Sequence, residues 1–201
     1  MHDMKRRTLV LAAGVVVGGL WGAPAMAGPT PSMLSNTCAG CHGPQGVAPG
    51  PSIPTIAGMP YNFLKLMMTE YMKGDRPSTI MGRVAKGYSD VEIDAIAKHF
   101  AGLKWGVQGG ASVKGKSVDP AKAEKGKALA KECEKCHEEG GKKQDEDTPR
   151  LAGQWLEYLQ VKIDDYKTNE KYPQPKKMKS QMDKLSVEDL DAIAHYFAGQ
   201  K

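Results

Sequence analysis

Apolar and polar residues alternate along this chain at helical spacing in several separate stretches. The clearest stretch begins at Ser89, which forms the sequence of a capping box with Glu92, and ends at Gly102. Its apolar residues lie on one face of the expected helix: Val91, Ile93, Ile96, Ala97 and Phe100. Residues 61–73 predict another helix, which Gly74 ends. The pattern therefore favours an all-α protein.

Proline and glycine separate these helices from the rest of the chain. Residues 43–54 are rich in both residue types, and residues 77–87 begin with proline and end with glycine, so we expect a loop in each stretch. Further along, Asp119 is a good N-cap and Pro120 suits the first position of a helix. We expect that helix to reach about Lys131.

The whole pattern occurs twice. The pairs offset by 95 residues are Cys38 and Cys133, Pro54 and Pro149, Ala57-Gly58 and Ala152-Gly153, and Tyr71 and Tyr166. After a small insertion the offset becomes 97, with the pairs Met81 and Met178, Ser89 and Ser186, Ile96 and Ile193, and Phe100 and Phe197. A repeat of this length indicates two homologous domains. We assign residues 28–104 to the first, the Gly- and Ser-rich residues 105–118 to a linker, and residues 119–201 to the second.

Residues 1–27 have the layout of a signal peptide. Basic residues that end at Arg7 precede an apolar run from Thr8 to Gly22, and Ala25-Met26-Ala27 offers a small-residue cleavage site. An uncleaved anchor is the alternative, but the run is short and contains four glycines. We therefore expect this segment to be removed on export to the periplasm, and the mature chain to have no membrane span.

The charge of the chain disfavours one class of partner. The 28 basic and 23 acidic residues give a net charge of +5. The signal region holds three of these bases and one of these acids, so the mature chain carries +3. A balance this mild, without a basic stripe interleaved with aromatic residues, predicts no nucleic-acid partner.

All four cysteines belong to one motif that is present twice: Cys38-Ala39-Gly40-Cys41-His42 and Cys133-Glu134-Lys135-Cys136-His137. Cys-x-x-Cys-His is the attachment sequence of c-type haem, in which two thiols add to one porphyrin and the imidazole binds its iron. A redox dithiol or a zinc site would leave the adjacent histidine unexplained. We therefore predict two covalently bound haem c groups, with His42 and His137 as iron ligands.

The sixth iron ligand is expected to be a methionine, because a thioether opposite histidine is usual in electron carriers and raises the reduction potential. Met81 and Met178 hold matching places among the eleven methionines, each eight residues before its serine cap. Met182 is the rival in the second half, but it aligns with Ala85. We therefore expect Met81 and Met178 to bind the two irons.

Pro54 and Pro149 each follow their motif histidine by twelve residues. A proline carbonyl is free to accept a hydrogen bond, so we expect each to accept from the Nδ1–H of its haem histidine and to orient the ring. The alternative is that both are only loop residues. His99 and His195 lie at non-equivalent places on the last helix of each half, so we expect them on solvated faces and not at the irons.

Several stretches carry a resemblance to a known family: residues 36–43, 78–89 and 133–141, with Leu151-Ala152-Gly153-Gln154 and Tyr158-Leu159. With them the chain resembles the dihaem class I cytochromes, which include cytochrome c4. It is more similar still to the dihaem cytochrome subunit of flavocytochrome c sulfide dehydrogenase, chiefly through Ser78-Thr79-Ile80-Met81-Gly82-Arg83. The resemblance spans nearly all of the mature chain and departs from the family at residues 168–177.

The resemblance implies a fold of two tandem class I cytochrome c domains and a role in electron transfer. It implies a flavoprotein (FAD) subunit as the partner in a heterodimer, on which sulfide is oxidised, and a soluble cytochrome c as the acceptor. This chain would then not be an enzyme, and its glycines form no dinucleotide fingerprint. A free carrier of the cytochrome c4 type, feeding a terminal oxidase, is the alternative. An enzyme such as a dihaem peroxidase is disfavoured by the two methionines.

Charge also favours the first domain as the point where electrons enter. Residues 43–54 are uncharged, whereas residues 138–147 are charged and better suited to a transient partner. The flexible stretch 103–118 would let the two domains dock face to face.

Overall fold

The computed structural model describes residues 28–106 and 115–200. The predicted signal peptide, residues 1–27, and the centre of the predicted linker lie outside the described residues. Every regular element in the two described ranges is a helix, so the all-α prediction is confirmed. None of these helices is long and apolar enough to cross a membrane.

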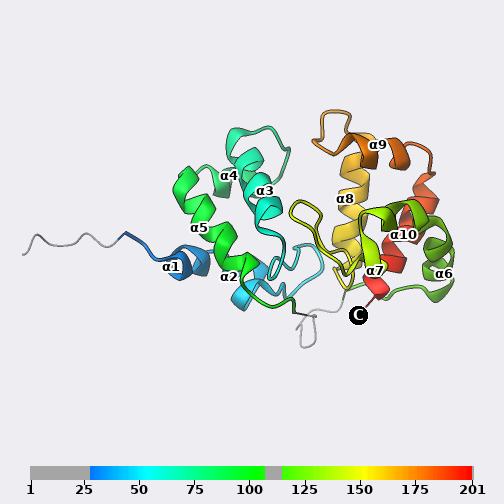
Figure 1. Cartoon of the computed structure of the whole chain (residues 1–201), viewed down its shortest axis with the longest axis horizontal. Helices are drawn as coiled ribbons and strands as arrows, with labels where there is room; N and C mark the ends of the chain where they lie inside the picture. Colours follow the sequence, from blue (N-terminus) through cyan, green and yellow to red (C-terminus); the bar gives the residue numbers. More distant parts are fainter. Residues whose placement is uncertain (1–27, 107–114, 201) are drawn as a thin grey trace, which may run out of the picture.

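The helices form two groups that lie side by side (Figure 1). The first group contains α1 (Pro31–Asn36), α2 (Ala39–His42), η1 (Pro44–Gly46), α3 (Tyr61–Lys73), α4 (Met81–Ala85) and α5 (Asp90–Ala101). The second contains α6 (Pro120–Leu129), η2 (Ala130–Lys135), α7 (Glu138–Gly141), α8 (Leu156–Thr168), α9 (Lys176–Met182) and α10 (Val187–Gly199). In the first group α5 packs against α1 and α3, and in the second α10 packs against α6 and α8. The two groups therefore repeat one architecture.

Local sequence signals set several of the helix ends. The Ser89 side chain accepts from the Glu92 N–H at the start of α5, and the Glu92 carboxylate accepts from the Ser89 N–H, which is the expected capping box. Gly74 adopts a left-handed conformation, with φ 82°, and ends α3. The Asp119 carboxylate accepts from two backbone N–H groups at the start of α6.

Two helix predictions differ from the structure. Residues 77–87, which were expected to form a loop, contain α4, a helix of five residues that is too short to show helical periodicity in the sequence. The helix expected to reach Lys131 ends at Leu129 and continues as the 3₁₀ turn η2.

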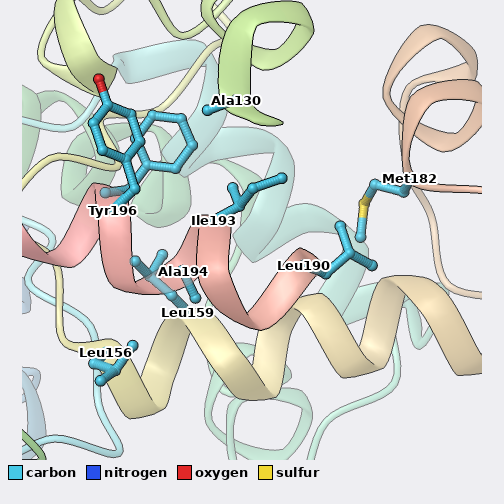
Figure 2. Packing of buried hydrophobic residues seen from close by; sticks show 9 residues of the cluster. Ala130, Leu156, Leu159, Met182, Leu190, Ile193, Ala194 and Tyr196 are labelled. Carbon is cyan, nitrogen blue, oxygen red and sulfur yellow. The ribbon is translucent and has the colours of Figure 1, made fainter. Parts of the chain in front are cut away.

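The core of each domain is built on its last helix. In the second domain, α10 packs against α8 and against Met182 of α9 through apolar side chains that include Leu190, Ile193, Ala194 and Tyr196 (Figure 2). In the first domain, α5 contributes Ile96, Ala97 and Phe100, which pack with Met59 and Leu64. The apolar positions that the helical pattern predicted on α5 are therefore core positions, apart from the exposed Val91.

Gly126 allows α6 to approach α10 closely. A side chain at this buried position would overlap the backbone of Ala192 and Ile193, which cannot rotate away as a side chain can. We expect Gly126→Ala to lower the free energy of unfolding by about 1–3 kcal/mol, because overpacking outweighs the better helix propensity of alanine. Urea unfolding followed by circular dichroism measures the change, with the exposed Lys127→Ala as the control. Equal or higher stability of the Gly126→Ala protein would contradict this account.

The two domains share a buried, hydrogen-bonded interface. The Gln154 side chain bonds both to the N–H and to the carbonyl of Thr55, each at 3.0 Å. Beside it, the Trp155 indole N–H donates to the Ala48 carbonyl at 3.3 Å. Thr55 and Gln154 are buried, at 0% and 2% exposure, so their hydrogen bonds form away from water.

A second contact between the domains is centred on Arg76. Its guanidinium donates to Glu70 at 2.7 Å within the first domain and to the Pro173 carbonyl of the second domain at 3.0 Å. The same group lies 4.7 Å from the centre of the Tyr172 ring. Tyr172 and Pro173 belong to the stretch that holds the insertion in the second half. The segment in which the two halves differ therefore contacts the first domain.

Candidate haem sites

The first Cys-x-x-Cys-His motif forms a single helical turn. Cys38 precedes α2, while Cys41 and His42 lie within it, and the His42 N–H donates to the Cys38 carbonyl at 2.8 Å. Cys41 is exposed, and Cys38 is half-buried. The turn therefore brings both thiols and the imidazole to one end of the first domain.

His42 has the hydrogen bond that the spacing predicted. Its Nδ1 lies 2.8 Å from the Pro54 carbonyl oxygen, and the ring is buried. Because a carbonyl can only accept, Nδ1 carries the proton and Nε2 keeps its lone pair. Burial lowers the pKa of His42, and the hydrogen bond to Pro54 opposes part of this effect. A neutral imidazole with a free Nε2 is the form that binds a metal.

The second motif has a similar local structure in a different helical context. Cys133 lies in η2, and the His137 N–H donates to the Cys133 carbonyl at 2.8 Å. The His137 Nδ1 lies 3.2 Å from the Pro149 carbonyl oxygen, and burial again lowers the pKa of His137. The ring meets Phe197 edge to face, with 6.3 Å between centroids. Both motifs therefore present the same donor set.

The donor set fits a covalently attached haem. All four cysteines are described, and none forms a disulfide, so two thiols are free at each motif. Each histidine uses Nδ1 on a carbonyl, which leaves one imidazole nitrogen for iron. Within residues 28–106 and 115–200, no three His, Cys, Asp or Glu side chains gather as a metal-binding group of their own.

The candidate methionines differ in their surroundings. Met81 opens α4 and Met178 lies within α9, and both side chains are partly buried. Met182 is only 7% exposed and packs in the second core, with its sulfur directed toward Leu190 (Figure 2). The thioether of Met182 is therefore part of the core, whereas Met178 packs at the edge of it.

The expectation for His195 was wrong. Its ring is 6% exposed, and its Nδ1 accepts from the Asp119 N–H at 3.0 Å, so it does not lie on a solvated face. The helical pattern of α10 alone did not show that the start of α6 covers this position. His99 is partly exposed and stacks edge to face on Phe100.

Sequence reasoning missed the role of Gln154 as an interface residue. It appeared only within a stretch that carried the family resemblance. The repeat did contain a signal, because the counterpart of Gln154 at the 95-residue offset is Met59, which cannot make the same hydrogen bonds. Trp155 also lies at the domain interface, through its bond to Ala48, and the guanidinium of Arg150 in the second domain lies 5.1 Å from the centre of the Trp105 ring.

The fold and the two motifs define a class of protein. Two repeated helical domains, each with a Cys-x-x-Cys-His turn, are tandem class I cytochrome c domains, and the chain carries two covalently bound haem c groups. Residues 123–201, which hold the second motif, match the cytochrome c family, and the chain as a whole is similar to dihaem c-type cytochromes.

Comparison with known proteins agrees with this class. The chain is 42% identical over 71 residues to the cytochrome subunit of sulfide dehydrogenase from Chlorobaculum tepidum, a match that covers 35% of this chain and 64% of that protein. It is 29% identical to cytochrome c4 from Pseudomonas aeruginosa, over 81% of this chain and 83% of that protein. A thiosulfate dehydrogenase structure from Marichromatium purpuratum superposes with a TM-score of 0.70 at 25% identity, covering 82% of this chain and 36% of that one.

Proposed function

We propose that this protein is the electron-transfer subunit of a sulfide-oxidising flavoprotein complex and passes the electrons to a soluble cytochrome c. The observation that carries this proposal is the 42% identity to a protein named as the cytochrome subunit of sulfide dehydrogenase. Catalysis would belong to a separate FAD-containing subunit in a heterodimer. The periplasm is the proposed compartment, on the basis of the signal-peptide layout of residues 1–27.

The proposed binding residues are those of the two motifs and their methionines. Haem c, when bound, supplies a reversible one-electron iron couple. Cysteines 38, 41, 133 and 136 would attach the two groups, and His42 and His137 would each hold one iron. Met81 and Met178 would complete the two iron sites. The buried position of Met182 supports the choice of Met178.

The proposed domain boundaries are residues 28–104, 105–118 and 119–201. The last helix of the first group ends at Ala101, and the first helix of the second group begins at Pro120, which supports this division. The described ends of the linker contact the second domain, because the Lys116 N–H bonds to Glu157.

The surfaces beside the two methionines support entry of electrons at the first domain. Ile80 and Val84 beside Met81 are exposed, at 57% and 40%, which suits a lasting contact with a subunit. Lys176, Lys177 and Lys179 surround Met178 on exposed positions of α9, which suits a transient, charge-steered partner. The first domain would therefore face the flavoprotein and the second the acceptor.

Purification together with an exported flavoprotein tests the proposal. We expect the isolated cytochrome not to turn over sulfide, but to be reduced within the stopped-flow time range once the flavoprotein and sulfide are added. Ile80→Asp is expected to slow this reduction at least tenfold, because it places a charge in the apolar contact, at a cost of at least about 1.4 kcal/mol. Val187→Asp is the matched control on the second domain, since Val187 is similarly exposed, at 60%.

The outcomes separate the candidate functions. Rapid sulfide turnover by the isolated cytochrome would refute the subunit proposal. Absence of a flavoprotein partner, with efficient reduction of a terminal oxidase, would favour the free cytochrome c4-type carrier, which the match over 83% of cytochrome c4 supports. Reduction by thiosulfate and its dehydrogenase, but not by sulfide, would keep the electron-transfer role and change the donor.

A further inference from the structure

One peptide group connects the first haem histidine to the second domain. The carbonyl of Pro54 and the N–H of Thr55 belong to the same peptide bond. The carbonyl oxygen accepts from the His42 Nδ1–H at 2.8 Å, and the N–H donates to Oε1 of Gln154 at 3.0 Å. His42, Thr55 and Gln154 are all buried, so the chain of hydrogen bonds is shielded from water.

The orientation of the Gln154 amide follows from its partners. Its Nε2 donates to the Thr55 carbonyl at 3.0 Å, so the oxygen must be the atom that faces the Thr55 N–H. The backbone N–H of Trp155 also donates to that oxygen, at 3.2 Å. A flipped amide would place donors against two N–H groups, which excludes the alternative assignment.

The second haem site lacks this arrangement. The matching peptide joins Pro149 to Arg150, and no described residue accepts a hydrogen bond from the Arg150 N–H. The repeat counterpart of Gln154 in the first domain is Met59, which has no amide. The His137 bond to its carbonyl is also longer, at 3.2 Å against 2.8 Å for His42. The second domain is therefore linked to the first haem site by hydrogen bonds, but the first domain has no such link to the second haem site.

We propose that Gln154 of the second domain tunes the His42 iron ligand of the first domain through the Pro54–Thr55 peptide. An acceptor on the peptide N–H increases the negative charge on the carbonyl oxygen, because hydrogen bonds in a chain polarise one another. The more negative carbonyl pulls harder on the Nδ1–H and makes the imidazole a more basic ligand. A more basic ligand favours the oxidised iron, so Gln154 lowers the reduction potential of the first site.

This inference rests on the proposed assignment of His42 as an iron ligand, but not on the identity of the redox partner. It makes docking of the two domains part of the chemistry of the first site, because the tuning residue comes from the other domain. Gln154 is thus a positioning residue that acts through His42, in addition to its role in holding the domains together.

The test compares two variants of the full-length, haem-loaded protein. Gln154→Met keeps the length of the side chain, uses the residue found at the repeat counterpart, and removes the acceptor. Trp155→Phe removes the neighbouring hydrogen bond to Ala48 and leaves the Thr55 N–H partner in place. Both midpoint potentials are measured by spectroelectrochemical titration, and the His42 Nδ1–H resonance of the reduced protein is followed by NMR.

We expect Gln154→Met to raise the potential of the first site, to leave the second unchanged, and to shift the His42 Nδ1–H resonance upfield. Trp155→Phe should change neither potential. No shift in Gln154→Met, or an equal shift in Trp155→Phe, would overturn the proposal, since the second result would mean a general loosening of the interface.

A further variant keeps the test decisive if Gln154→Met does not fold. Gln154→Glu retains an acceptor oxygen for the Thr55 N–H, so the first potential should stay at or below the native value. A rise in this variant would also overturn the proposal. All measurements use the protein without a partner, so they remain a valid test of this inference even if the flavoprotein is not the redox partner. Fewer than two haems per chain would instead show that the assignment of the sites is wrong.

Discussion

The Met178→Ala protein should lose about half of any near-infrared sulfur-to-iron charge-transfer absorbance, because one of two thioether ligands is removed. The potential of the second site should fall, since the thioether favours the reduced iron. The free energy of unfolding should change less than it does when the buried Met182 is truncated, because Met178 packs at the edge of the core and not inside it. Near-infrared absorption and redox titration on the same sample measure both effects.

Met182→Ala should give the opposite result. Its side chain is buried beside Leu190, so truncation leaves a cavity and should lower the free energy of unfolding by about 2–5 kcal/mol. The near-infrared band should remain complete. If Met182→Ala removes the band and Met178→Ala does not, the alignment of the second half with the first is wrong.

Among the ion pairs of the described residues, we expect the one between the buried Arg76 and Glu70 to contribute most to stability. The side chain of Arg76 is 4% exposed and pairs with Glu70, which is 18% exposed. Arg76→Gln leaves the Glu70 carboxylate without its partner and removes the bond to the Pro173 carbonyl, so we expect a loss of about 3 kcal/mol. Thermal and urea unfolding of the haem-loaded protein measure it.

Two companion variants identify the cause. Lys98→Ala removes an ion pair in which the lysine is 66% exposed, and should change stability by less than about 1 kcal/mol. Adding Glu70→Gln to Arg76→Gln removes the unpaired charge and should restore part of the loss. If the double variant is no more stable than Arg76→Gln alone, the loss comes from the contact with Pro173 and Tyr172 and not from the carboxylate.

The sequence predicted what depends on neighbours along the chain. The capping box at Ser89, the helix end at Gly74 and the spacing from His42 to Pro54 all act over a few residues, and each is present in the structure. Contacts between distant segments were not predictable in this way. The bond from Gln154 to Thr55 joins residues 99 positions apart, and the burial of His195 depends on the approach of Asp119. Helical periodicity gives the face of a residue on its own helix, but not what covers that face.

The interface formed by Gln154 and Thr55 limits how the two halves can be exchanged. In a symmetric dimer of identical domains, each contact occurs twice, with the two residues in swapped roles. The repeat counterpart of the Thr55–Gln154 pair is Arg150 with Met59, and a methionine cannot hydrogen-bond both sides of a peptide backbone as an amide does. The first domain alone, which has Met59 in place of Gln154, could therefore not rebuild these hydrogen bonds as a homodimer. When the two copies are joined in one chain, their interface does not have to be self-complementary. The second domain can then provide the amide side chain and the first domain the backbone groups that it bonds.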